Sequence, residues 1–253
     1  MSDPCRQGVL AFGDSITNAG GELQWGVALQ SWALWTARGL GLPYSGYAQD
    51  GAVLRDVPER QLPAWRATAA RPDARYDLGC LYIGVNDVRG PDWDRDAFAA
   101  GYRQALRAIG EHCDRVLAVT VPLDLGRPRN PARMREANAV IGAAADLILD
   151  LADFGARNLV MTDHVHPTAF GQIAIAERAL GVLAAAGMEV RVRPSTLIDY
   201  ETTRFKRLRG DLTYAYRHAK VSARAALVRR AVSAAAGSSG RRGRAAARRR
   251  GSP

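Results

Sequence analysis

The sequence predicts an α/β protein in which a parallel β-sheet lies between layers of helices. Two observations lead to this fold class. Short apolar runs alternate along the chain with longer segments of helical periodicity, and the links between them are short. Hydrophobic residues make up 47% of the 253 positions, which is enough for a sizeable buried core. Strands that alternate with helices in this way pair in parallel, because each helix carries the chain back across the sheet.

Five apolar runs have the length and composition of strands. The first ends at Gly13 and the fourth ends before Pro122, since glycine and proline interrupt a strand. The second is the weakest pattern, and the third is the one most typical of a fully buried strand. The predicted strands are residues 8–12, 44–48, 78–83, 115–120 and 147–151.

Five longer segments between these strands have helical patterns. Gly39 and Gly41 close the first of them, as glycines commonly do at the C-terminus of a helix. A loop rich in proline and arginine, residues 124–133, precedes the fourth. The predicted helices are residues 25–40, 53–65, 96–113, 134–145 and 168–186.

The character of the chain changes after Pro194. Apolar residues then recur at steps of three and four, which predicts an amphipathic helix with basic flanks. The apolar series is Phe205, Leu208, Leu212, Tyr216, Ala219, Ala223 and Leu227, and the flanking basic residues are Arg204, Lys206, Arg207, Arg209, Arg217, Lys220 and Arg224. From Gly237 onward, Gly, Ser, Ala and Arg dominate, which is typical of disorder. We therefore expect a globular domain at residues 1–194, a basic helical extension at 195–236 and a disordered Arg-rich tail at 237–253.

The net charge of +10 comes from the C-terminal part of the chain. Residues 1–200 contain 20 Arg and Lys against 23 acidic residues, whereas residues 201–253 contain 15 against 2. Three interpretations of this basic part remain open: a helix packed on the body, a helix lying on an anionic membrane surface, and a nucleic-acid contact. The nucleic-acid interpretation rests on charge alone, without a recognisable motif, and is the least favoured.

The cysteines and the apolar segments of the sequence indicate the cellular compartment of the protein. Cys5, Cys80 and Cys113 are widely spaced and form neither a metal-binding pattern nor a disulfide framework. We find no apolar segment of the kind that forms a signal peptide or membrane span. The expectation is a cytoplasmic protein, with a peripheral membrane location if the basic helix binds lipid.

Three polar clusters lie at predicted strand ends or in loops beside the sheet, so they could converge on one edge. Their residue types suit acyl transfer. A serine hydroxyl needs a base, a histidine can supply it, and an aspartate three residues earlier can orient the ring. The tetrahedral oxyanion needs aimed donors such as backbone N–H groups or an asparagine side chain. The clusters are Gly13 to Ser15, Gly84 to Asp87, and Asp163 to Pro167.

The third cluster contains two histidines, which could be metal ligands instead of catalytic residues. His164 and His166, with Asp163, could be metal ligands, but the remaining histidines, His112 and His218, bring no second cluster of ligands. We expect no metal. The spacing to Asp163 and the following proline favour His166 as the base. Asp14 is expected to hold the turn rather than to take a chemical step.

These clusters, in this order, resemble the SGNH/GDSL hydrolase superfamily. Residues 12–16 match its first block, with Ile16 in place of the usual Leu. Residues 84–87 match its Gly-x-Asn-Asp block, and Asp163 with His166 matches its Asp-x-x-His block. In the second block Gly51 stands where the family has a glycine, although Gly46 stands where an Asn is frequent. The likeness spans roughly residues 7–186.

The resemblance implies a fold, a site and an activity. The fold would be a flavodoxin-like three-layer α/β/α sandwich, here with the basic helical C-terminal extension added. Ser15, Asp163 and His166 would be the catalytic triad, and Ser15, Gly51 and Asn86 the oxyanion hole. The enzyme would be a GDSL-type esterase, lipase or deacylase that cleaves a small-molecule ester or thioester without a cofactor. An acyltransferase acting on a sugar or other hydroxyl is the alternative, and a degenerate, non-catalytic binding module is disfavoured because Ser15, Asn86 and His166 are all present.

Overall fold

The computed structural model describes residues 7–21, 23–24, 26–69, 74–125, 130–155 and 158–199. It also describes eight positions farther along, namely 205, 208, 212, 215, 216, 219, 220 and 223. The chain divides into two compact units, Met1–Tyr200 and Glu201–Pro253. The expected disordered tail at 237–253, Cys5 and Leu227 lie outside the described residues.

A parallel sheet of five strands forms the centre of the first unit. The order across the sheet is β4-β1-β5-β6-β7. β1 and β5 are buried along their whole length, as expected for central strands covered on both faces. The strands are β1 (Val9–Gly13), β4 (Tyr44–Gly46), β5 (Leu78–Tyr82), β6 (Val116–Val119) and β7 (Leu147–Leu149).

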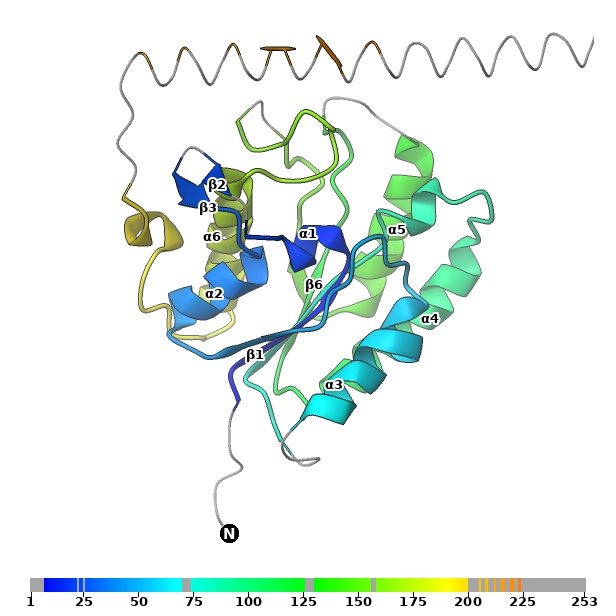
Figure 1. Ribbon diagram of the computed structural model, residues 1–253. Coiled ribbons are helices and arrows are strands. Elements are labelled where there is room, and N and C mark those ends of the chain that lie inside the picture. Colours follow the sequence, from blue (N-terminus) through cyan, green and yellow to red (C-terminus); the bar gives the residue numbers. More distant parts are fainter. Residues whose placement is uncertain are drawn as a thin grey trace, which may run out of the picture. The chain divides into compact units, whose positions relative to one another are not determined.

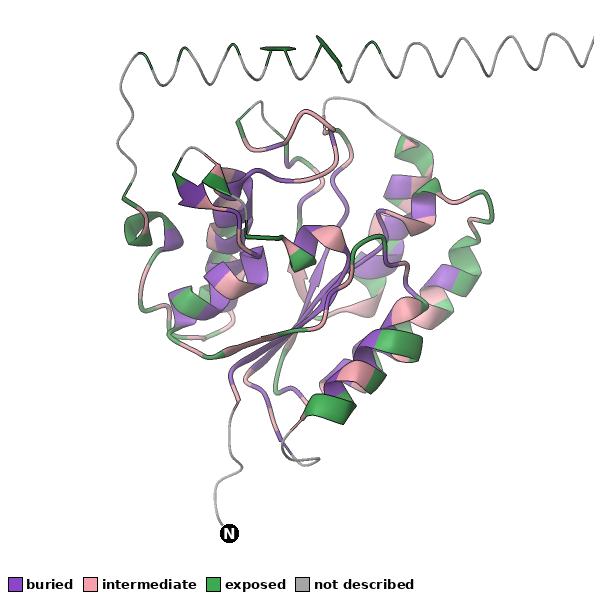
Figure 2. Ribbon diagram, in the orientation of Figure 1, coloured by how far each residue is buried: buried purple, intermediate pink, exposed green. Residues whose placement is uncertain are grey.

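Helices cover both faces of this sheet, which confirms the predicted α/β class (Figure 1). α2 and α6 lie on one side, and α3, α4 and α5 on the other. Figure 2 shows that the central strands and the inward sides of these helices are buried, so the core lies on both faces of the sheet. The helix bounds are α2 (Trp32–Leu40), α3 (Leu62–Thr68), α4 (Arg95–Gly110), α5 (Pro131–Ala144) and α6 (Ala169–Ala185). Two short 3-10 turns, η2 (Asp87–Arg89) and η3 (Pro194–Leu197), lie outside these helices.

The strand order creates a position where a ligand site is expected. The chain runs from β1 to β4 on one side of β1, and then crosses back to β5 on the other side. Connections therefore leave the carboxyl ends of β1 and β5 in opposite directions, and a crevice forms between them. The segments carrying Ser15 and Asn86 follow these two strands.

Two predicted helices begin later in the chain than expected, whereas the one expected at 134–145 begins earlier, at Pro131, because Asn130 is its N-cap. The helix expected at 25–40 begins only at Trp32, because a hairpin of β2 (Leu23–Gln24) and β3 (Val27–Ala28) comes first. Gly26 in its turn has a φ of 85°, which is incompatible with a right-handed helix.

The helix expected at 53–65 begins as a π-helical turn, η1 (Val57–Gln61), and continues as α3. Its first residues form a loop because carboxylates take their backbone N–H groups. The N–H of Val53 donates to Asp56, and that of Leu54 donates to Asp87, each over 2.9 Å. Within the described residues, no helix has the length and apolar character needed to cross a membrane.

The first turn of α6 packs directly against backbone. A Cβ added at Gly171 would lie 2.0 Å from the carbonyl oxygen of Leu159, whereas a Cβ at Gly181 in the same helix meets nothing within 4 Å. We expect Gly171→Ala to lower the free energy of unfolding by about 2 kcal/mol or more, because backbone cannot move aside as a side chain can. Chemical denaturation measures this change.

Gly181→Ala is the matched control, since it adds the same methyl group to the same helix. We expect it to stabilise the protein by up to about 1 kcal/mol, as alanine favours a helix over glycine. Equal effects of the two substitutions would contradict the close packing of α6 on Leu159.

Candidate active site

Ser15 occupies the turn at the carboxyl end of β1. It is the first residue of a short helix, α1 (Ser15–Asn18), whose N-cap is Asp14. A carboxylate oxygen of Asp14 accepts the backbone N–H of Ile16 over 2.9 Å. Asp14 thus holds the turn that presents Ser15, as a capping carboxylate does.

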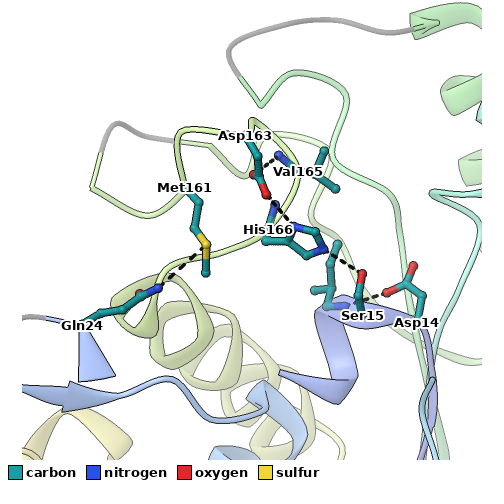
Figure 3. Close-up of polar contacts among 8 residues, drawn as sticks. Asp14, Ser15, Gln24, Met161, Asp163, Val165 and His166 are labelled. Atoms are coloured by element: carbon teal, nitrogen blue, oxygen red, sulfur yellow. Dashed lines mark hydrogen bonds and ion pairs between the residues drawn. The ribbon is translucent and has the colours of Figure 1, made fainter. Parts of the chain in front are cut away.

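Ser15, His166 and Asp163 form one hydrogen-bonded chain, although Ser15 and His166 are 151 residues apart (Figure 3). The distance from Ser15 Oγ to His166 Nε2 is 2.8 Å. On the other side of the ring, His166 Nδ1 lies 2.6 Å from Asp163 Oδ2. A histidine between a hydroxyl and a carboxylate in this way can remove the hydroxyl proton while the carboxylate fixes the ring.

The loop before α6 fixes which histidine faces Ser15. The second carboxylate oxygen of Asp163 accepts the N–H groups of Val165 and His166, which makes a tight turn. His164 has a φ of 59°, and its Nδ1 lies 2.8 Å from the carbonyl oxygen of Leu125. His166 is therefore the histidine that contacts Ser15, while His164 is buried against another loop.

The loop at residues 49–52 lies between the Ser15 turn and Asn86. On one side, the Asn18 amide donates to Asp50 over 2.9 Å. On the other, the Asn86 amide donates to the carbonyl oxygen of Ala52 over 2.9 Å. Gly51 is thereby held between α1 and the end of β5. An asparagine amide has a second hydrogen, so Asn86 can also donate to a bound oxyanion.

Gly51 has a φ of 73°, a backbone conformation that other residues adopt at a cost. An added Cβ would nevertheless meet nothing within 4 Å. Backbone conformation, rather than lack of space, is thus the reason for glycine at this position.

The electrostatics suit a histidine that gains a proton during reaction. The hydrogen bond to Asp163 raises the pKa of His166 above its ordinary value of 6.5, and this effect outweighs burial. Burial raises the pKa of Asp163, but hydrogen bonds from His166 and from backbone N–H groups outweigh it, so the pKa falls below 3.8. Asp163 therefore stays ionised beside the ring, as an orienting carboxylate must.

Two further aspartates near the site, Asp14 and Asp87, have raised pKa values, in contrast to the lowered pKa of Asp163. Burial raises the pKa of Asp14 to about 7 and that of Asp87 to about 6. In the described part of the chain, one oxygen of each carboxylate is buried without a hydrogen-bond donor. Asp14 and Asp87 thus differ from Asp163, which has a partner for each oxygen and is 43% exposed at its side chain.

Two buried glutamines support the site and were not predicted. Gln61 bonds both the N–H and the carbonyl oxygen of Gly13, over 3.0 and 2.8 Å. Gln172 donates to the carbonyl oxygen of Ile16 and accepts the N–H of Trp32, both over 2.8 Å. A glutamine within a helical pattern is usually a surface residue. The sequence therefore contained no indication that Gln61 or Gln172 would be buried and would bond the backbone around Ser15.

No group of three or more His, Cys, Asp or Glu side chains is arranged to hold a metal ion in the part of the chain that the structure describes. The arrangement that is present joins a hydroxyl, an imidazole and a carboxylate at the crevice of a parallel sheet. A histidine held between a hydroxyl and a carboxylate is the arrangement that serine hydrolases use.

The family follows from the sequence itself. A model of the GDSL-like lipase/acylhydrolase family matches residues 11–173, which is more than half of the chain. The chain belongs to this family. A search of curated proteins gives no significant match.

Solved structures agree on the fold. One is Axe2, an acetylxylan esterase from Geobacillus stearothermophilus, with 22% identity and a TM-score of 0.54; the match covers 76% of this chain and 100% of Axe2. Another is a putative GDSL-like lipase from Parabacteroides merdae, with 16% identity and a TM-score of 0.56 over 74% of this chain and 99% of that one.

The Asp163–His166 contact predicts the pH dependence of any reaction that uses His166 as a base. Only the neutral ring can accept a proton, so kcat/KM should rise with pH through an inflection above 6.5. In Asp163→Asn the charge that favours the protonated ring is lost. The inflection should move to lower pH, and kcat should fall by about 10²–10⁴. A pH–rate profile measures both changes.

Asp153→Asn is the control for this profile. Asp153 is exposed and bonds Arg178 over 2.7 Å, so its substitution should leave the inflection in place. An inflection unchanged in Asp163→Asn would show that His166 is not the titrating base.

Gln61 is expected to position Ser15 through Gly13. Gln61→Leu leaves the buried N–H of Gly13 unpaired, at a cost of about 1–3 kcal/mol, and frees the turn to shift. We expect kcat per folded molecule to fall about tenfold or more with little change in KM, since small misplacements of a reacting atom are costly.

Two variants separate positioning from stability. Gln61→Glu keeps one acceptor for the Gly13 N–H and should restore part of kcat. Gln30→Leu removes a glutamine that bonds only exposed Arg38 in the described structure, and should leave kcat unchanged. A loss in Gln61→Leu that disappears after correction for the folded fraction would reduce Gln61 to a purely structural role.

Proposed function

We propose that the protein is a serine esterase that hydrolyses esters of short acyl groups through an acyl-Ser15 intermediate. The observation that carries the proposal is the hydrogen-bonded series from Ser15 Oγ through His166 to Asp163, at 2.8 and 2.6 Å. Membership of the acylhydrolase family supports the same chemistry.

The first half of the reaction forms the acyl-enzyme. His166 Nε2 takes the hydroxyl proton while Ser15 Oγ attacks the ester carbonyl carbon, and Asp163 stabilises the resulting imidazolium. The N–H groups of Ser15 and Gly51 and the amide of Asn86 receive the oxyanion. When the tetrahedral intermediate collapses, the proton passes from His166 to the departing alcohol.

The second half releases the acid. His166 removes a proton from water, which attacks the acyl carbon, and the proton returns to Ser15 Oγ as the carboxylic acid leaves. Every proton is carried by His166, so the cycle needs no cofactor. Free thiols at the buried Cys80 and Cys113 are compatible with work in a reducing, cytoplasmic compartment.

Hydrolysis is favoured over acyl transfer by the exposure of the site. The side chains of His166 and Asp163 are 37% and 43% exposed, so water reaches the base directly. A transferase must keep water from the acyl-enzyme while its acceptor binds. Adding sugar alcohols to an ester assay and measuring new esters distinguishes the two reactions.

A small apolar pocket beside the site supports a short acyl group. Its walls include Val85 and Val165, each next to a proposed functional residue, Asn86 or His166, together with Leu123 and Met134. The pocket is small and partly open to solvent. A small apolar pocket holds a short chain better than a long fatty acid.

Solved forms of Axe2 suggest the first substrates to test. Axe2 is named as an acetylxylan esterase, and its catalytic mutants replace a serine, an aspartate and a histidine with alanine. The same three residue types form the proposed triad here, so acetyl esters are the first compounds to assay.

Ser15→Ala should abolish turnover. We expect kcat for p-nitrophenyl acetate to fall by about 10⁴ or more, because the nucleophile is removed. Labelling by a fluorophosphonate probe, read by intact-protein mass spectrometry, should disappear. Ser45→Ala, in the partly exposed edge strand β4, is the control and should keep both. Persistent labelling of Ser15→Ala would place the nucleophile elsewhere.

Met134→Ala should widen the pocket and shift the preferred chain length. We expect the ratio of kcat/KM for butanoate to that for acetate to rise about threefold to tenfold, since one or two methylenes in a pocket are worth that much. The ratio is insensitive to any loss of folded protein. Met188→Ala, which removes the same atoms outside the pocket walls, should leave it unchanged. An unchanged ratio in Met134→Ala would exclude the pocket as the acyl site.

A further inference from the structure

A row of apolar side chains is exposed in the second unit of the chain. All eight described positions between 205 and 223 are helical and exposed. Four of them are large: Phe205, Leu208, Leu212 and Tyr216 are 72%, 57%, 64% and 68% exposed. They follow one another at steps of three and four residues, so they lie along one face of the helix.

Alanines continue this face and a lysine accompanies it. Ala215, Ala219 and Ala223 have the same helical spacing, and all three are exposed. Lys220 is helical and exposed as well. By comparison, the described part of the first unit has two exposed large hydrophobic residues, Leu23 and Leu197, which are far apart in sequence. A contiguous apolar row on a helix marks a surface that binds something apolar.

The charge of this unit limits what the partner can be. Residues 201–253 contain 15 Arg and Lys against 2 acidic residues. A partner must therefore offer negative charge beside an apolar layer. A second copy of the same unit would bring the same positive charge and repel it. The phosphates of a nucleic acid would neutralise this positive charge, but a nucleic acid would make no use of the exposed Phe, Leu and Tyr side chains.

We propose that the segment containing residues 205–223 binds the surface of an anionic lipid bilayer. The apolar row enters the boundary between headgroups and acyl chains, and the basic residues meet the lipid phosphates. The proposal goes beyond ester hydrolysis and does not depend on Ser15. It assigns the second unit the task of holding the enzyme at a membrane surface.

Vesicle sedimentation of the full chain tests the proposal. The vesicles contain phosphatidylcholine alone, or phosphatidylcholine with phosphatidylglycerol. We expect a partition coefficient at least about tenfold higher for the anionic vesicles, and a fall in binding as salt is added, because salt screens the attraction.

A double variant distinguishes the apolar row from charge alone. Leu208→Ser with Leu212→Ser leaves every charge in place, and should weaken partitioning about tenfold or more because less apolar surface enters the bilayer. Leu23→Ser with Leu197→Ser is the matched control: it removes the same number of exposed leucines from the first unit, and should leave partitioning unchanged.

Three results would overturn the proposal. The first is no sedimentation of the full chain with anionic vesicles. The second is equal binding by the Leu208/Leu212 variant, which would reduce the attraction to charge, as for a nucleic acid. The third is a dimer in light scattering that this variant dissociates, which would make the apolar row an interface between copies.

Discussion

The hydrogen bonds of one buried side chain, Gln172, hold together the two halves of the site. Gln172 lies in the first turns of α6, directly after the loop that carries His166. Its amide donates to the carbonyl oxygen of Ile16 in α1, and its oxygen accepts the N–H of Trp32 at the start of α2. The Trp32 indole in turn donates to Thr17 of α1 over 3.1 Å. These bonds fix the distance between the helix bearing Ser15 and the segment bearing His166.

A second set of bonds fixes the Ser15 turn from the other side of the sheet. Gln61 in η1 pairs with both backbone groups of Gly13, and the N–H of Gln49 also donates to the Gly13 carbonyl oxygen. The turn is thus held from α6 and from the segment after β4. Such rigidity lowers the entropy cost of reaction, because a hydroxyl that is already held beside its base does not have to be brought into the reactive geometry.

Burial distinguishes the aspartates around His166. Asp163 accepts three hydrogen bonds and is partly exposed, so it remains charged beside the ring. Asp14 is fully buried, its carboxylate accepts the N–H of Ile16, and burial raises its pKa to about 7. A charge on Asp14 nevertheless favours protonated His166. Asp163 contacts the ring of His166 while Asp14 caps the helix that bears Ser15, and the difference in their pKa values comes from solvent and hydrogen bonds rather than from residue type.

The sequence by itself determined the class of fold and singled out most residues of the proposed site. Apolar runs and helical periodicity are local signals, and five predicted strands correspond to the five strands of the sheet. The residues Ser15, Asn86, Asp163 and His166 stood out because three polar clusters occurred in order at strand ends. Tertiary structure alone decided that β2 and β3 form a hairpin, that residues 53–56 form a loop, and that Gln61 and Gln172 support the site. Bonds between distant parts of the chain hold these features in place: Gln24 accepts the N–H of Ala169, Leu54 donates to Asp87, and Gln61 pairs with Gly13. A local pattern cannot encode a bond whose other half lies 33 to 145 residues away, because only folding brings the two groups together.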